Sequence, residues 1–183
     1  MLSLSLFCRK NPGFNFLWLV DRLCIGVAFA GGLIRLGNFF NSEIVGKPTD
    51  LPWGVVFGRV DQLTRHPAQL YESFTYFLIF GILYKLFWND RYRGSRGFLF
   101  GIFLILVFGF RFLIEFAKEN QVAFESQLPI DMGQILSIPL VLIGVWLASR
   151  ALRVGVSPPI PLAHGGAEPA GLKKRKFDKL ANP

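Results

Sequence analysis

The sequence has few charged residues for its length. Asp, Glu, Lys and Arg make up 17% of its 183 residues, whereas soluble domains carry about 25%. Hydrophobic residues make up 52%, and the mean hydropathy is +0.42. Several apolar runs reach the roughly 20 residues that a helix needs to cross a bilayer. This shortage of charge excludes an ordinary soluble domain and predicts an integral membrane protein with one membrane domain.

Cysteine is also scarce. The two cysteines, Cys8 and Cys24, are too few for a disulfide framework. Cys24 lies in an apolar run, which predicts a packed thiol. The segment Met1–Phe7 is short and apolar but lacks the basic leader and the small-residue cleavage site of a signal peptide. We therefore predict neither a disulfide framework nor a signal peptide.

The charge that is present is mostly basic and is unevenly distributed. The formal net charge is +8, and much of it comes from Lys173–Lys176 and from a short loop at 89–96. Nucleic-acid recognition would need a basic face on a folded soluble surface, and the sequence shows none, so we expect no nucleic-acid partner. Basic loops of membrane proteins stay on the cytoplasmic side, so this charge indicates which parts of the chain face the cytoplasm.

The apolar runs predict an all-α membrane protein with about four transmembrane helices. A polar segment at 41–65 contains two prolines and turn residues, which predict a small irregular segment on the outer face between the first and second helices. The C-terminal tail is expected to be drawn to anionic lipid, and a solvated tail without a specific role is the simpler alternative. The predicted parts are an N-terminal flank at 1–16, a transmembrane domain at 17–150 with spans at 17–40, 67–88, 97–116 and 133–149, and a disordered basic cytoplasmic tail at 151–183.

The loop charges also predict which residues share one depth in the bilayer. Four spans with the loop at 89–96 and the tail on the cytoplasmic side leave two connections outside, at 41–65 and 117–132. A charge within an apolar segment is costly and marks a functional site. The unusual polar residues that this topology gathers near the outer half are Arg35, His66, Glu72, Arg111 and Glu115.

The first of these charges, Arg35, has no acidic residue within several positions. Arg35, Asn38 and Asn41 follow at intervals of three, which places them near one face of a helix. A planar guanidinium fits a phosphate group, and the amides can bind neighbouring hydroxyl or ester groups. The alternative is that Arg35 only extends to the lipid headgroups. The clustering of Asn38, Asn41 and Glu43 favours a binding site.

Arg111 and Glu115 are four residues apart on the third span and can form a pair on one helix face. A lone pair of this kind is typical of a structural salt bridge at the membrane interface. Beside Arg35, the same arginine would make a second phosphate contact, oriented by its carboxylate. The sequence leaves both interpretations open.

His66 stands just before Pro67, and proline is favoured at the first position of a helix. The start of a helix attracts anions, and histidine titrates near neutral pH, so His66 is a candidate for a functional role. A capping or packed histidine is the alternative. Gln69 and Glu72 lie on the same opening turns and are candidates for orienting a ligand.

These residues fall into ordered blocks that resemble a known family. The block at 35–57, which begins Arg35-Leu36-Gly37-Asn38, closely resembles the signature of the bacterial prolipoprotein diacylglyceryl transferases. Three further blocks match in the same order, so the resemblance covers about residues 17–150. They are Arg65-His66-Pro67-Ala68-Gln69-Leu70-Tyr71-Glu72, Arg111-Phe112-Leu113-Ile114-Glu115-Phe116 and Met132-Gly133-Gln134-Ile135-Leu136-Ser137-Ile138-Pro139.

The resemblance implies a multi-pass enzyme of the bacterial inner (cytoplasmic) membrane. It would transfer the diacylglyceryl group of phosphatidylglycerol to the thiol of the lipobox cysteine in a prolipoprotein signal peptide, the first step of lipoprotein maturation. No metal and no cofactor are implied. The implied catalytic residues are Arg35, Glu43, His66 and Arg111, and the implied substrate-binding residues are Arg35, Asn38, Asn41, Gln69, Glu72, Arg111 and Glu115.

The chain also departs from the family pattern. The family has about seven spans, and its N-terminal helices carry a His-Gly-Gly segment that the predicted spans here lack. His164-Gly165-Gly166 lies in the tail and cannot replace it, and Val107 and Phe108 stand where a tyrosine is common. We therefore expect the C-terminal part of the enzyme. The alternatives are a non-catalytic membrane remnant that binds anionic lipid and, ranked last, a small transporter, for which no internal repeat is visible.

Overall fold

The computed structural model describes residues 2–11, 14–89, 92, 94–115 and 132–155. The predicted tail beyond residue 155 and most of the predicted outer loop at 117–132 therefore lie outside the described residues. Helices account for most of the described chain. The elements are α1 Leu2–Lys10, α2 Phe16–Asn41, β1 Val55–Val56, β2 Thr64–Arg65, α3 Ala68–Phe87, α5 Phe98–Ile114 and α6 Met132–Val154.

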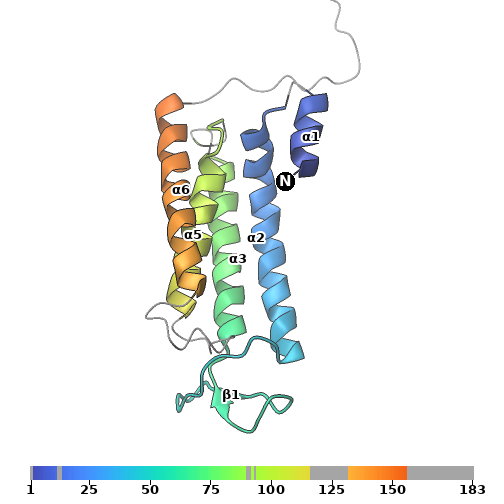
Figure 1. The fold of residues 1–183 in the computed structure, drawn as a ribbon, viewed down its shortest axis with the longest axis vertical. Helices are drawn as coiled ribbons and strands as arrows, with labels where there is room; N and C mark the ends of the chain where they lie inside the picture. Colours follow the sequence, from blue (N-terminus) through green and yellow to red (C-terminus); the bar gives the residue numbers. More distant parts are fainter. Residues whose placement is uncertain (1, 12–13, 90–91, 93, 116–131, 156–183) are drawn as a thin grey trace, which may run out of the picture.

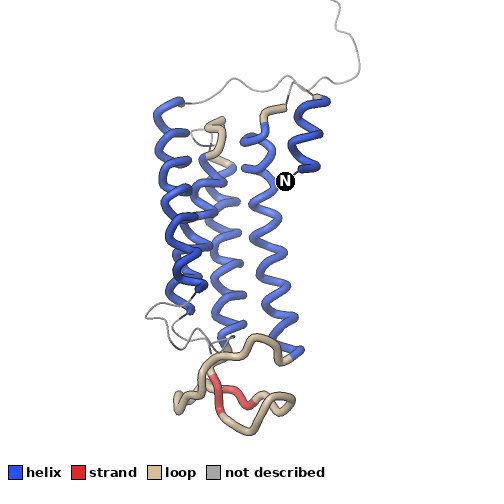
Figure 2. Tube along the Cα trace, viewed as in Figure 1, coloured by secondary structure: helices blue, strands red, loops and turns tan. Residues whose placement is uncertain are grey.

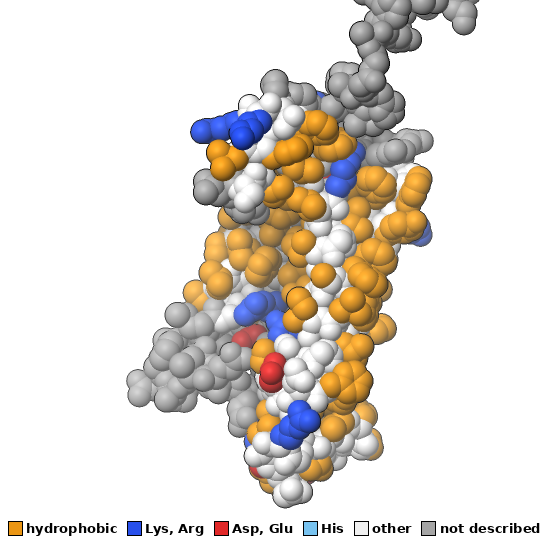
Figure 3. Space-filling model, turned by 90° about the vertical axis from the view of Figure 1, so that its right-hand side faces the viewer, with side chains coloured by type: hydrophobic (Ala, Val, Ile, Leu, Met, Phe, Trp, Pro, Cys, Tyr) orange, Lys and Arg blue, Asp and Glu red, His pale blue; other side chains and the backbone are white. Residues whose placement is uncertain are grey.

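Four long helices lie side by side and alternate in direction along the chain (Figures 1 and 2). Three of them, α2, α3 and α6, are long and apolar enough to cross a membrane, and α5 is a shorter apolar helix. This confirms the prediction of an all-α membrane protein. Apolar side chains cover most of the helical surface on the face that Figure 3 shows.

Helices α2 and α3 approach closely where α2 carries two adjacent glycines. A methyl group on Gly31 would stand 2.9 Å from the ring of Tyr76, and one on Gly32 would stand 2.8 Å from the ring of Phe77. The hydroxyl of Ser73 donates a hydrogen bond to the carbonyl of Gly32 at 2.9 Å. Small residues of this kind let membrane helices pack at short range. The contact lies directly beside the pocket described below.

Helices α5 and α6 pack in the same manner around Gly101 and Gly144. A methyl group on Gly101 would stand 2.7 Å from the backbone nitrogen of Ala148 and 2.8 Å from the carbonyl oxygen of Gly144. Buried apolar residues surround this contact, including Leu99 and Leu147. The two helices therefore form a tight pair that holds α5 in place.

The start of α5 is tied to α2 by a buried carboxylate. Asp21 of α2 is 3% exposed and accepts hydrogen bonds from the backbone N–H groups of Gly97 at 2.6 Å and Phe100 at 2.8 Å. Arg35 follows Asp21 by 14 residues, and Arg111 follows Gly97 by 14 residues. Since α2 and α5 run in the same direction (Figure 1), both arginines lie about 21 Å along their helices from this anchor.

The segment between α2 and α3 is irregular and lies at one end of the bundle (Figure 2). Its two short strands pair antiparallel, with Val55 opposite Arg65. Arg65 is buried and organises the segment. Its Nη1 donates to the carbonyl of Gly46 at 3.1 Å, and its Nη2 donates to Asp61 at 2.6 Å. The segment is therefore a loop with a defined polar centre, and its location on the outer face stays a prediction.

Candidate functional site

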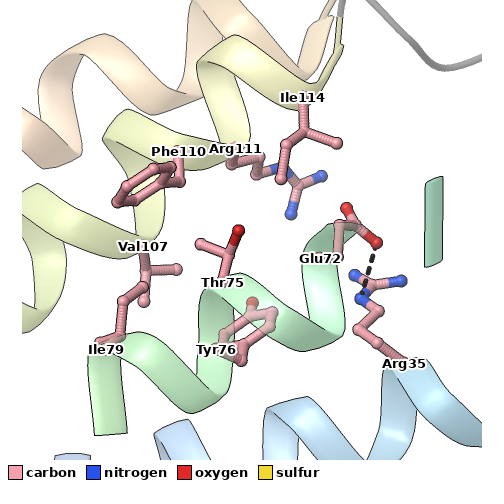
Figure 4. A pocket seen from close by; sticks show the side chains of 9 residues that line it. All are labelled: Arg35, Glu72, Thr75, Tyr76, Ile79, Val107, Phe110, Arg111 and Ile114. Carbon is pink, nitrogen blue, oxygen red and sulfur yellow. Dashed lines mark ion pairs between the residues drawn. The ribbon is translucent and has the colours of Figure 1, made fainter. Parts of the chain in front are cut away.

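A pocket lies between α2, α3 and α5, in the half of the bundle nearest the β1–β2 segment (Figure 4). It contains two arginines from different helices, Arg35 and Arg111, and one carboxylate, Glu72. On the face shown in Figure 3, basic and acidic side chains gather in this region below an apolar surface. The lining residues are Arg35, Glu72, Thr75, Tyr76, Ile79, Val107, Phe110, Arg111 and Ile114.

Arg35 forms an ion pair with Glu72. Its Nε lies 3.0 Å from Oε2 of the carboxylate, and the side chains are 18% and 7% exposed. Burying either charge alone would be costly, and the pairing offsets much of that cost. The contact uses Nε, so the terminal amino groups of the guanidinium extend beyond it (Figure 4). The sequence placed both residues at one depth but did not identify Glu72 as the partner of Arg35.

The predicted pair between Arg111 and Glu115 is wrong. Among the described residues, Arg111 has no ion-pair or hydrogen-bond partner, and its guanidinium points into the pocket (Figure 4). The carboxylate of Glu115 instead packs against the start of α6, where a methyl group on Gly133 would stand 2.7 Å from its Oε1. Its Oε2 is buried without a hydrogen-bond partner in the described part of the chain. Packing against α6 therefore replaces the expected contact along α5.

The charges of the pocket leave a positive site. Among the described residues that line it, two arginines and one carboxylate sum to a formal charge of +1, and the others are uncharged. Apolar walls raise the strength of this field because they exclude water. A phosphodiester carries one negative charge, and guanidinium groups bind its oxygens through paired N–H donors. The site is therefore suited to the phosphate of an anionic lipid.

The other polar residues predicted at the end of α2 do not line this pocket. Asn38 is partly buried, whereas Asn41 and Glu43 are exposed. The carbonyl of Asn38 accepts a hydrogen bond from the backbone N–H of Glu43 at 2.9 Å. Gln69 is fully buried, and its Nε2 donates to the carbonyl of Glu43 at 2.7 Å. Gln69 thus fastens the end of α2 to the start of α3.

His66 lies on the segment just before α3 and is partly buried. Its Nδ1 is 3.3 Å from the hydroxyl of Tyr71, which also accepts a hydrogen bond from Nε1 of Trp53 at 2.9 Å. The backbone of His66 is held on both sides, by the carbonyl of Lys47 and the N–H of Gly46. His66 is not among the residues that line the pocket, so the structure places it in a neighbouring polar cluster.

Two polar lining residues were missed by sequence reasoning, beside four apolar ones. Thr75 and Tyr76 follow Glu72 by three and four residues, so all three share one face of α3. That spacing was the available signal. No group of three His, Cys, Asp or Glu residues that could hold a metal ion occurs within the described ranges.

Comparison with known proteins finds relatives that match most of the chain. The family model for prolipoprotein diacylglyceryl transferase matches residues 1–150. A phosphatidylglycerol–prolipoprotein diacylglyceryl transferase from Tolumonas auensis is 53% identical over 147 residues, which are 80% of this chain and 57% of the relative. Relatives of the same name from Chloroherpeton thalassium and Bacteroides fragilis are 46% and 47% identical, over 84% and 80% of this chain and 57% and 52% of their own lengths. No solved structure matches the chain.

Proposed function

Because the chain belongs to the prolipoprotein diacylglyceryl transferase family, we propose that it takes part in transferring the diacylglyceryl group of phosphatidylglycerol to a prolipoprotein. The names of its relatives give both substrates. The chain spans about half the length of the curated relatives it matches. The observation that carries the proposal is the pocket in which Arg35 and Arg111 face one another across Glu72.

The reaction requires control of a growing negative charge. The thiol sulfur of the lipobox cysteine attacks the carbon of the diacylglyceryl group that bears the phosphate ester. A C–S bond forms as the C–O bond breaks, and glycerol phosphate leaves with the electron pair. The phosphate passes from one negative charge toward two, so the positive pocket stabilises the transition state more than the bound lipid. Arg35 and Arg111 would supply this stabilisation.

The thiol must lose its proton before or during attack, because the thiolate is the nucleophile. We assign this step to the polar cluster beside the pocket, with His66 as the proton acceptor. The contact between Nδ1 of His66 and Tyr71 would hold the ring in one orientation. Glu43 would support this cluster as a second ionisable group. The buried Cys24 is not required, since the reacting thiol belongs to the substrate.

The remaining predicted residues would hold the lipid and the peptide around the reacting atoms. Asn38 and Asn41 would bind the glycerol and ester groups from the end of α2. Gln69 would maintain the contact between α2 and α3, and its Oε1, which is buried without a hydrogen-bond partner among the described residues, is a further acceptor. Glu115, whose Oε2 is buried without a hydrogen-bond partner in the described ranges, would bind a hydroxyl group. Glu72 would orient Arg35.

The expected location of the chain in the membrane follows from the charge of its loops. The basic residues at 89–96 would lie on the cytoplasmic side of the bacterial inner membrane. The pocket, which lies toward the opposite end of the helices, would then face the outer side. A signal peptide that spans the same membrane would present its cysteine near that depth. This topology makes the chain a multi-pass protein with its reactive end facing the prolipoprotein.

The test is a direct assay of the product. The full chain is placed in phosphatidylglycerol vesicles with a synthetic lipobox peptide, and the thioether adduct is measured by mass spectrometry. The relative from Tolumonas auensis serves as the positive control, and a peptide with serine in place of the cysteine serves as the negative control. We expect diacylglyceryl addition to the cysteine peptide alone. Lipid binding without any adduct, under conditions in which the relative reacts, would overturn the proposed catalysis.

A further inference from the structure

A second basic pocket lies at the opposite end of the bundle from Arg35 and Arg111. It forms where α2 begins, α6 ends and the chain enters α5, and its cavity volume is about 150 Å³. Its two charged residues, Arg96 and Arg150, come from different parts of the chain. The remaining lining residues are Asn15, Leu17, Ala151, Val154 and Gly155.

The charge of this second pocket is not balanced by its lining. Among the residues that the structure describes, no acidic side chain lines it. Within the part of the chain that the structure describes, neither Arg96 nor Arg150 forms an ion pair. The nearby carboxylate of Asp21 is used by the backbone N–H groups of Gly97 and Phe100. Two like charges that converge in this way repel each other unless an anion lies between them.

One N–H donor in this pocket is buried away from water. Nε of Arg96 is buried and has no hydrogen-bond partner among the described residues. A buried N–H group without an acceptor is unfavourable, and more so when the group is charged. Arg150 is held differently, with its guanidinium carbon 5.7 Å from the ring centre of Trp146. The stacking fixes the direction of this side chain and leaves its N–H groups available for a ligand.

The other surroundings also favour an anion with an apolar body. The pocket lies at the start of α2, whose first turn carries partial positive charge, and at the end of α6, whose last turn carries partial negative charge, so the two arginines supply its net positive charge. Leu17, Ala151 and Val154 supply apolar surface beside the arginines. A phosphate group fits both arginine forks, and acyl chains fit the apolar side. Free phosphate would bind the arginine forks but has no acyl chains to contact the apolar side.

We propose that Arg96 and Arg150 form a binding site for the phosphate headgroup of an anionic membrane lipid, separate from the pocket of Arg35 and Arg111. Basic pockets between transmembrane helices at the cytoplasmic side bind anionic headgroups in this way. The bound lipid would bridge the entry to α5 and the end of α6. The site does not depend on the proposed transferase reaction, because it needs no prolipoprotein and no turnover.

The experiment counts lipids on the intact chain. Native mass spectrometry of the full chain in detergent, titrated with phosphatidylglycerol, is compared among the wild type, Arg96→Gln/Arg150→Gln and Arg35→Gln/Arg111→Gln. We expect two retained lipids on the wild type and one on each double variant. The matched control is Arg9→Gln/Arg153→Gln, which removes two exposed charges that do not line the pocket and should keep both lipids.

Further arms separate the possible ligands and exclude misfolding. Phosphatidylcholine, which has no net charge, should not fill the second site, and inorganic phosphate at millimolar concentration should not displace the lipid. Arg96→Lys/Arg150→Lys should retain the lipid at least tenfold better than the glutamine variant, because it keeps both charges. Equal lipid counts for the wild type and Arg96→Gln/Arg150→Gln would overturn the proposal. Displacement by inorganic phosphate would overturn the assignment to a lipid.

Discussion

Replacing Arg35 with lysine separates the charge of this residue from its geometry. In the structure Nε of Arg35 lies 3.0 Å from Glu72, while its terminal amino groups extend beyond that contact. A guanidinium can therefore serve the carboxylate and a phosphate at the same time. An ammonium group is a single point of charge and cannot hold both in this geometry. The Arg35→Lys variant keeps the charge of the pocket and loses one of the two interactions.

The size of the effect follows from the lost hydrogen bond. A hydrogen bond to a charged group contributes roughly 1.5–3 kcal/mol. If it acts on the transition state, each 1.36 kcal/mol changes the rate tenfold, so Arg35→Lys should slow thioether formation by roughly 10- to 150-fold. Arg35→Ala removes the charge as well and should abolish detectable transfer. The rate is measured in phosphatidylglycerol vesicles with a lipobox peptide, with product quantified by mass.

The control for this prediction is Arg59→Lys. Arg59 is exposed, lies in the segment at the same end of the bundle and does not line the pocket. Its replacement should leave the rate unchanged. Equal rates for the wild type and Arg35→Lys would refute the reasoning, because they would show that charge without the planar fork is sufficient. Normal turnover by Arg35→Ala would remove this residue from the site.

Three further predictions concern the scaffold. Asp21→Ala leaves two buried N–H groups at the start of α5 without an acceptor, so the free energy of unfolding should fall by about 1–3 kcal/mol, measured as a lower unfolding midpoint. Asp21→Asn should recover part of this loss. Gly101→Val forces α5 away from Ala148 and should cost about 1–3 kcal/mol by the same measurement, whereas a valine at the exposed Gly26 should cost less. Hydrogen bonds from Arg65 hold the pKa of Asp61 below its ordinary value. Their contribution to the stability of the segment between α2 and α3 is therefore present above about pH 4 and is lost as the pH falls through the lowered pKa. In a carboxyl NMR titration Arg65→Gln should raise the pKa of Asp61, and an unchanged value would contradict the assignment.

The helices could be predicted from apolar runs because a span has a minimum length in a bilayer. The first predicted span, 17–40, differs by one residue at each end from α2 Phe16–Asn41. The last, 133–149, is too short, because α6 continues to Val154. The predicted tail begins at residue 151, directly after Arg150. Ala151 is 3% exposed and packs in the core, which continues the helix past that arginine.

Helix α1 was not predicted, since its nine residues form a weakly patterned stretch. Its place depends on contacts with residues just beyond its end rather than on its own sequence. The ring of Phe7 packs on Phe14 with centroids 5.6 Å apart, and Phe14 packs on Trp18 at 5.8 Å. Tertiary contacts of this kind decide the state of short helices, because isolated helices of this length are marginal.

The depth of the candidate site could be predicted, but its pairings could not. Loop charge and span counting were enough to bring Arg35, Glu72 and Arg111 to one level. Which charge pairs with which depends on how the helices are rotated, and the sequence holds no direct signal for that. The spacing of four between Arg111 and Glu115 favoured a local pair, whereas the close approach of α6 at Gly133 draws the carboxylate away. Arg111 is left for the pocket.

The central claim is that Arg35 and Arg111 together hold one lipid phosphate. Solid-state NMR measures it directly, through dipolar couplings between ¹⁵N-labelled guanidinium groups of the full chain and the ³¹P nucleus of phosphatidylglycerol in bilayers. We predict two couplings at hydrogen-bond range, one of which disappears in Arg35→Lys and the other in Arg111→Lys. Couplings that survive both substitutions, or guanidinium groups of Arg35 and Arg111 that show no coupling to phosphorus, would contradict the account.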